Sequence, residues 1–183
     1  MITGDYFDGM DGMLENFTTP LNRLAAPRGV FFITGNHETY LGLSKALDAL
    51  KQAKVRILND EVVNLNGLSL VGIHYPNQGE NINIPTIIKK LKPAHPAILL
   101  YHAPSQVEVI AKSGIDLMLS GHTHKGQFWP FNYFTQMIFG KYYNGQNQIG
   151  DFTIYTSPGT GTWGPAIRVG NQPEVTVIKL VNK

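Results

Sequence analysis

Residues 97–124, AILLYHAPSQVEVIAKSGIDLMLSGHTH, decide the fold class of this chain. Two apolar runs, AILLY at 97–101 and IDLML at 115–119, stand on either side of a helical stretch at 105–113. Short apolar runs predict buried strands, and a helix between two of them predicts a strand–helix–strand unit with a parallel sheet. Each run is followed at once by histidine, first His102 and then His122 with His124.

Apolar runs and helical stretches also alternate on both sides of this stretch. We expect further strands at 29–34, 68–73, 152–156 and 175–180, and further helices at 43–54 and 84–91. Strands that alternate with helices are typical of α/β architecture. No helix is expected between the last two strands, so an antiparallel portion should join the sheet.

The composition fits one globular domain covering residues 1–183, with 43% hydrophobic residues. The formal net charge is only +2 and no dense Lys/Arg stripe is present, so we expect no nucleic-acid partner. The chain has no cysteine, which excludes disulfides, thiolate metal sites and cysteine nucleophiles and leaves the compartment open. We find no signal peptide and no apolar stretch long enough to span a membrane.

Polar side chains follow four of the expected strands directly. Asp5 comes after Ile-Thr-Gly, Asn36 after the strand at 29–34, and His102, His122 and His124 after the two strands of the opening stretch. Ligands of open α/β sheets bind outside the carboxyl ends of the strands, so these groups should converge. Mixed nitrogen and oxygen ligands without sulfur suit Mn, Fe or Zn.

Each of these pieces alone has a simpler interpretation. A Gly-Asp after a strand is usually a turn, Asn36 could cap a helix, and His102 alone would be a half-buried imidazole. The joint pattern of four strand ends, each with a ligand type, favours a metal site.

The motifs GDYFD at 4–8, GNHE at 35–38, His102 and GHTH at 121–124 resemble, in this order, those of the calcineurin-like metallophosphoesterases. The resemblance covers nearly the whole chain and implies an α/β fold of two packed mixed β-sheets flanked by helices. The stretches GHTHKGQFWPF and SPGTGTWGPAIRVG are similar to a membrane-associated branch whose members often carry an N-terminal anchor. The resemblance therefore leaves two locations open, cytoplasmic and membrane-associated.

The resemblance implies two divalent metal ions (Mn, Fe or Zn) and a role for each matching residue. Asp5 bridges both ions, and His124 serves one of them. The protein ligands that complete the other ion are Asn36, His102 and His122.

The resemblance implies a catalytic role without metal binding for His37. His37 protonates the leaving oxygen and is oriented by Asp8, whereas Glu38 and Thr123 are structural. His74, which follows the strand at 68–73, is expected to be a rim residue and not a ligand.

The implied activity is metal-dependent hydrolysis of phosphoric esters, with diesters favoured over monoesters. A metal-bound hydroxide attacks phosphorus, and His37 acts as general acid. Two alternatives stay open: a non-catalytic scaffold that binds a protein partner, and a truncated protein that binds one metal. The presence of His37 with Asp8 favours an enzyme.

One part of the family pattern has no match, because no Asp-x-His occurs in the sequence. We expect the strand that carries it to be missing, so that the domain is N-terminally truncated and one ion keeps only Asp5 and His124. The loss of two ligands should lower the activity, and the open sheet edge should favour self-association.

An aromatic segment, from Phe128 to Tyr143, follows the last histidines. It is expected to form an apolar lip beside the site, which suits a lipid-linked substrate or contact with a membrane surface. The alternative, that these rings pack in the core, stays open.

Overall fold

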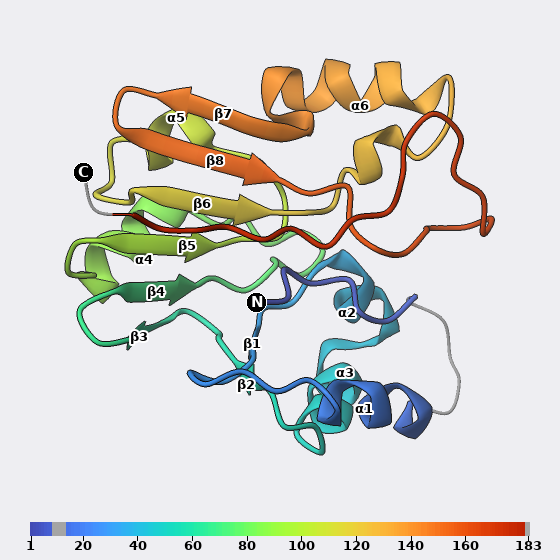
Figure 1. Ribbon diagram of the computed structural model, residues 1–183, viewed down its shortest axis with the longest axis horizontal. Coiled ribbons are helices and arrows are strands. Elements are labelled where there is room, and N and C mark those ends of the chain that lie inside the picture. The colour runs from blue at the N-terminus through green and yellow to red at the C-terminus, as the bar shows by residue number, and fades with distance from the viewer. Residues whose placement is uncertain (9–13, 182–183) are drawn as a thin grey trace.

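The computed structural model describes residues 1–8 and 14–181. A six-stranded sheet with the order β3-β4-β5-β6-β8-β7 forms its centre (Figure 1). The strands are β3 (Glu61–Asn64), β4 (Ser69–Gly72), β5 (Ala97–Leu100), β6 (Leu117–Ser120), β7 (Gly145–Ile149) and β8 (Phe152–Thr156). The four inner strands run parallel, whereas β3 and β7 pair antiparallel at the edges, so the sheet is mixed.

A smaller sheet packs beside the large one. β1 (Phe31–Phe32) and β2 (Arg56–Ile57) pair in parallel. Ile2 extends this sheet through an isolated bridge to Phe32, with hydrogen bonds from Ile2 N to Phe31 O (2.8 Å) and from Ile33 N to Ile2 O (3.1 Å). Two sheets flanked by helices confirm the expected α/β fold, but only the large sheet is mixed, because every pairing described in the small one is parallel.

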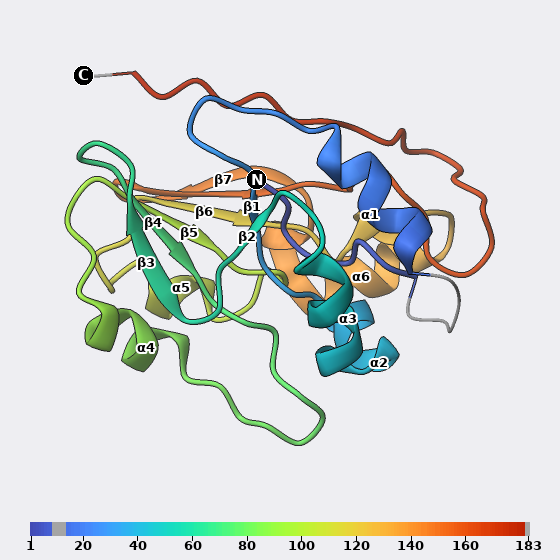
Figure 2. The same cartoon turned by 90° about the horizontal axis from the view of Figure 1, so that it is seen from below.

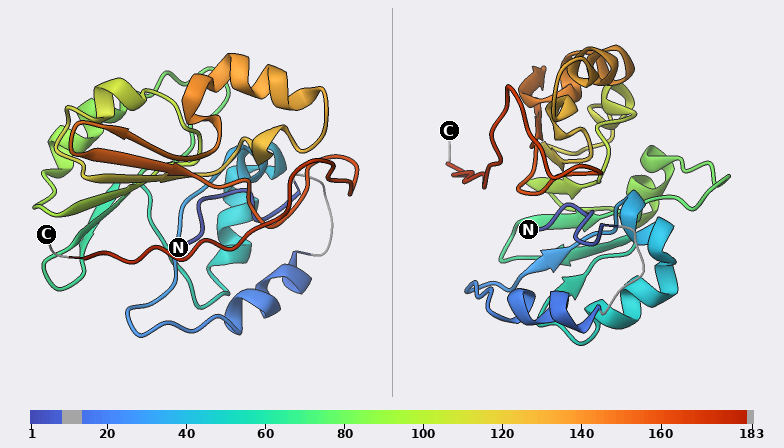
Figure 3. Two further views of the ribbon diagram at one scale, coloured as in Figure 1. Left: turned by 45° about the horizontal axis from the view of Figure 1, so that its top comes forward. Right: turned by 90° about the vertical axis from the view of Figure 1, so that its right-hand side faces the viewer.

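Helices cover the outer faces of both sheets. The small sheet is accompanied by α1 (Glu15–Asn22), α2 (Asn36–Leu41) and α3 (Leu43–Leu50), which form one layer with it in the right panel of Figure 3. The large sheet carries α4 (Ile84–Leu91) and α5 (Val107–Ile110) on one side, as Figure 2 shows. The remaining helices are α6 (Phe131–Phe139) and two 3₁₀ turns, η1 (His124–Gly126) and η2 (Gly140–Tyr143).

Local sequence explains α4 well, and its expected range is confirmed. The side chain of Asn83 accepts a hydrogen bond from Thr86 N (3.0 Å) and caps the first turn, where Pro85 is tolerated. Lys92 ends the helix in a left-handed conformation, and Ile84 and Ile88 are buried against the sheet.

The strands β4 and β5 of the large sheet are buried on both faces. Leu99 belongs to the cluster beneath α4 and α5, whereas Ile98 and Leu100 belong to the cluster that faces the small sheet and includes Ile33 and Leu70. A strand buried on both faces has no polar alternation, which is why AILL reads as one continuous apolar run.

The expected strand at 175–180 is wrong. Residues 171–181 run as an extended segment across the side of the large sheet opposite α4 (Figure 2), and no strand pairs with them among the described residues. Val175 and Val177 are 82% and 90% exposed. Alternating apolar residues make a strand only when a neighbour takes up the backbone hydrogen bonds, and none of the described segments does so.

Candidate metal centre

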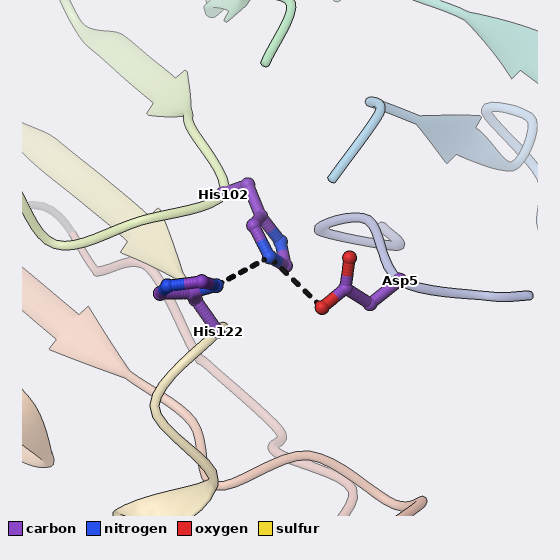
Figure 4. Close-up of side chains that lie close together, drawn as sticks. All are labelled: Asp5, His102 and His122. Atoms are coloured by element: carbon purple, nitrogen blue, oxygen red, sulfur yellow. Dashed lines mark hydrogen bonds and ion pairs between the residues drawn. The ribbon is translucent and has the colours of Figure 1, made fainter. Parts of the chain in front are cut away.

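Four side chains meet at the carboxyl ends of strands from both sheets. Asp5 follows the Ile2 bridge, Asn36 begins α2 directly after β1, and His102 and His122 follow β5 and β6. Figure 4 shows Asp5, His102 and His122 pointing toward one another. The structure thus brings together four of the five residues that the sequence singled out as ligands.

The atoms of these four side chains that could bind a metal ion lie close together. His102 Nε2 lies 3.1 Å from Asp5 Oδ2, 3.0 Å from Asn36 Oδ1 and 3.1 Å from His122 Nδ1. His122 Nδ1 lies 2.7 Å from Asn36 Oδ1. His102 and Asn36 are buried, and Asp5 and His122 are half-buried.

The tautomer of His102 shows why this group fits a cation. His102 Nδ1 is 2.6 Å from Thr3 O, and a carbonyl oxygen can only accept, so Nδ1 carries the proton. In the neutral ring Nε2 is then a lone pair, directed at the carboxylate of Asp5 and the amide oxygen of Asn36, which also accept. Three acceptors that converge in this way suit a divalent ion, and the backbone contact of Nδ1 is typical of metal-binding histidines.

The charge states of the group also suit metal binding. Burial alone would raise the pKa of Asp5, but the contact with His102, whose Nε2 donates and whose ring carries a charge when it is protonated, and the backbone N–H of His37 bring it to about 2. Burial, with a contribution from the neighbouring His102, lowers the pKa of His122 to about 4. At neutral pH Asp5 is therefore an anion and His122 a neutral ring, the forms that bind metals.

The loop that carries Asp5 is held by Glu38, which is fully buried. Glu38 Oε2 accepts from Asp5 N (2.9 Å) and Gly35 N (2.6 Å), and Oε1 accepts from Tyr6 N (2.8 Å) and Phe7 N (3.3 Å). A carboxylate with four backbone donors fixes the loop firmly. These contacts support the structural role expected for Glu38, but the sequence did not indicate what it holds.

Close backbone approach at the site requires glycine at position 35. A Cβ on Gly35 would lie 2.2 Å from Asp5 Oδ1 and 2.7 Å from Asp5 N. Asp5 itself has a positive φ of 55°, a strained conformation for a residue other than glycine. The contacts of Glu38 and Gly35 stabilise Asp5 in that conformation.

His124 lies outside the group of Asp5, His102 and His122. Its Nδ1 is 3.3 Å from the guanidinium of Arg168, which also donates to the carbonyl oxygens of His124 and Pro158. Burial and the charge of Arg168 lower the pKa of His124 to about 4, so its ring is neutral at pH 7. The role of His124 as a ligand of the other ion stays a prediction.

His37 lies beside the cluster without belonging to it. Its backbone N–H donates to Asp5 Oδ1 (2.9 Å), and its Nδ1 is buried without a hydrogen-bond partner among the described residues. Its ring lies 5.8 Å from that of Tyr40. Asp8 is exposed, and its expected pairing with His37 stays a prediction.

Two aromatic rings border the site: Phe139 belongs to the aromatic segment expected beside it, whereas Tyr75 was not singled out as a site residue. Tyr75 lies 5.4 Å from the ring of His102, and Phe139, the last residue of α6, lies 5.7 Å from that of His122. Tyr75 comes soon after β4, so its position at a strand end was the signal for it. His74 pairs with Asp60 (2.8 Å) and not with the cluster.

The aromatic segment is tied to the C-terminal region beside the site. Phe128 and Phe131 pack against Trp163, with ring centroids 6.2 Å and 5.6 Å apart. The buried Gln127 holds this arrangement through its side chain, which accepts from Trp163 N (2.8 Å) and donates to Trp163 O (2.8 Å).

A cavity of about 780 Å³ opens from the cluster. Its lining includes Asp5, His37 and His102 together with apolar side chains such as Ile98 and Leu117. The cavity lies between the first residues of the chain, the large sheet and the C-terminal segment. The site therefore has a mostly apolar space beside it.

Comparison with known proteins identifies the family. The family described as "Calcineurin-like phosphoesterase" matches residues 1–126, which is more than half of the sequence. The chain belongs to this family of metal-dependent phosphoesterases, as its motifs implied.

Several curated proteins match nearly the whole chain. An uncharacterized metallophosphoesterase of Helicobacter pylori is 34% identical and covers 100% of this chain, which spans 51% of it. A Bos taurus transmembrane protein with metallophosphoesterase domain is 31% identical, with 98% of this chain and 45% of the relative covered. Phosphodiesterase YaeI of Escherichia coli is 31% identical, with 99% and 69% covered. The chain thus spans about half the length of the first two of these relatives.

A solved structure supports the fold. A putative 5'-nucleotidase from Staphylococcus aureus superposes with a TM-score of 0.52 at 15% identity, covering 80% of this chain and 35% of that one. At this identity the likeness concerns the fold alone. Although one relative is named a transmembrane protein, no helix among the described residues is long and apolar enough to cross a bilayer.

Proposed function

We propose that this chain hydrolyses phosphoric diesters in preference to monoesters at a centre that binds divalent metal ions. The proposed ligands of one ion are Asp5, Asn36, His102 and His122. For the second ion we propose Asp5 as the shared ligand and His124. The observation that carries the proposal is the convergence of acceptor atoms from four separate loops on one point beside His37.

Bound divalent ions would supply charge stabilisation for the phosphoryl group and a water activated at neutral pH. The protein's own part is to hold the ligands and to move a proton. The backbone of His37 is held by its contact with Asp5, and its ring carries a buried nitrogen that has no hydrogen-bond partner among the described residues. We propose that His37 gives a proton to the leaving oxygen, a contribution of about 10²- to 10⁴-fold in rate, and that Asp8 orients it.

The preference for diesters rests on a relative. YaeI is named a phosphodiesterase, and its 31% identity covers 99% of this chain. The alternative of a protein that binds one metal and catalyses little is favoured by a different observation. Only Asp5 and His124 are proposed for the second ion, and His124 Nδ1 faces Arg168 instead of the cluster.

Metal analysis of His102→Ala tests the proposal. Removing His102 takes away the nitrogen that touches the other three ligands, so bound metal and hydrolysis of bis-p-nitrophenyl phosphate should both be lost. His95→Ala is the matched control, because His95 is exposed and pairs only with Asp116 among the described residues. Metal content unchanged in His102→Ala would show that the ligands are assigned wrongly. Faster hydrolysis of p-nitrophenyl phosphate than of the diester would contradict the preference for diesters.

A further inference from the structure

The helix α6 is amphipathic, but its apolar side faces solvent and its more polar side faces the protein. None of its residues is fully buried. The side that is half-buried carries Asn132, Thr135 and Phe139 at helical spacing, so two of its three side chains are polar. The opposite side is exposed and almost wholly apolar.

This exposed side forms one continuous surface, which we call the α6 face. It consists of Trp129, just before the helix, and Tyr133, Phe134, Met137 and Ile138. Met137, Ile138 and Trp129 are 81%, 73% and 71% exposed. Tyr133 and Met137, and likewise Phe134 and Ile138, are four residues apart and therefore lie above one another on the helix. Soluble proteins expose single apolar side chains freely, but a group of large ones marks a surface that contacts something else.

The chemistry of the α6 face fits a lipid bilayer better than a protein. Trp and Tyr, which combine an apolar ring with a polar tip, are the residues enriched at the membrane interface. Residues 124–150 contain Lys125 and Lys141 but no Asp or Glu, so nothing in this segment repels anionic headgroups. Helical residues rise 1.5 Å each, so α6 is about 13 Å long and can lie in the interface but not span it.

The α6 face is fixed next to the candidate metal centre. Gly126 in η1 touches the start of α6 so closely that a Cβ there would lie 2.2 Å from Asn132 Cα. At the other end of the helix, Phe139 packs its edge on His122. In Figure 1 α6 lies at the border of the molecule beside β7, away from the helices α1 to α4. A bilayer in contact with α6 would therefore be close to His122 and the candidate metal centre.

We propose that the α6 face docks on the surface of an anionic lipid bilayer. Resting on the proposed function, it follows that the substrate is an amphiphilic phosphoester, drawn from that surface with its phosphate toward Asp5 and His37. The apolar cavity that opens from the same residues gives the apolar part of such a substrate a place to lie.

Vesicle flotation of the full chain tests the docking without any need for turnover. The wild type should float with vesicles of phosphatidylcholine and phosphatidylglycerol, and less well with phosphatidylcholine alone. The variant Phe134→Ser, Met137→Ser, Ile138→Ser should lower the partition coefficient by about 10-fold or more. All three side chains are exposed, so the substitutions leave the core intact.

The matched control replaces three exposed valines elsewhere: Val109→Ser, Val177→Ser and Val181→Ser. This variant should float like the wild type. Equal flotation of the α6 variant and the wild type would overturn the proposal, as would a wild type that does not float. A wild type that stays in solution and forms dimers that the α6 variant lacks would show instead that a second copy covers the face. Since flotation does not depend on catalysis, loss of metal or activity leaves this test intact.

Discussion

Glu38→Gln is the substitution that tests most directly how the site is built. The carboxylate of Glu38 receives four backbone N–H groups, two on each oxygen. An amide keeps one accepting oxygen and replaces the other with an NH₂ group, which can only donate. Two buried backbone donors, those of Asp5 and Gly35 or those of Tyr6 and Phe7, then lose their acceptor.

The magnitude follows from these two groups. A buried donor without a partner costs about 1–3 kcal/mol, so two of them cost about 2–6 kcal/mol. This is a large part of the roughly 5–15 kcal/mol by which a folded domain is usually stable. We also expect weaker metal binding in the fraction that stays folded, since the contacts of Glu38 hold Asp5 at its positive φ.

Urea denaturation followed by circular dichroism measures the change in free energy of unfolding. Glu61→Gln is the control, because among the residues that the structure describes the side chain of Glu61 pairs with Arg56 alone, at 3.5 Å on the surface. Such a pair is worth about 0–1 kcal/mol. A loss below about 1 kcal/mol in Glu38→Gln, similar to that of the control, would refute the reasoning that Glu38 holds this loop.

Three further predictions concern catalysis, pH and an added N-terminal strand. In an active, N-terminally extended form, His37→Ala should lower kcat by about 10²- to 10⁴-fold and leave the metal content of purified protein intact; loss of metal would contradict its role. Burial tends to lower the pKa of His74, but hydrogen bonds to Asp60 and Glu80 raise it overall. The stabilisation that protonated His74 contributes is therefore present below pH 6.5 and lost as pH rises through its raised pKa. His74→Ala should then lower the urea midpoint more at pH 5.5 than at pH 8.5. An equal loss at both pH values would argue against this role of His74. Extending the chain before Met1 with an apolar strand that ends in Asp-x-His should raise phosphodiesterase activity at low Mn²⁺ and reduce self-association. Equal activity and metal dependence of both forms would show that ligands from such a strand are not needed.

The positions of the candidate ligands could be predicted because they depend on a topological rule. Parallel strands end at one edge, so residues directly after such strands, like His102 and His122, come together whatever the details of packing. Asp5 and Asn36 followed the same rule from the smaller sheet. The ranges of β8 and α4 could also be predicted from the sequence, since the alternation of apolar residues in a strand and the capping of a helix depend on neighbouring residues.

Features that depend on distant partners could not be predicted. The contacts of Glu38 with Asp5, Tyr6 and Phe7 join residues 31 to 33 positions apart. The expected strand at 175–180 was wrong because apolar alternation does not show whether a neighbouring strand exists. The outward side of α6 was hidden for a similar reason, since an apolar helix reads the same whether its apolar side packs inward or outward.

The two sheets meet at the candidate metal centre. Asp5 and Asn36 belong to the small sheet, whereas His102 and His122 belong to the large one, whose strands all lie between residues 61 and 156. An ion held by these four side chains is therefore a cross-link between two layers that fold from separate parts of the chain. Removing the ion with a chelator should then loosen the contact between the two sheets as well as remove the metal from the site. Amide hydrogens of the small sheet would then exchange with solvent sooner, while those in the middle of the large sheet stay protected. An occupied metal centre would thus decide whether the domain unfolds as one cooperative unit or as two.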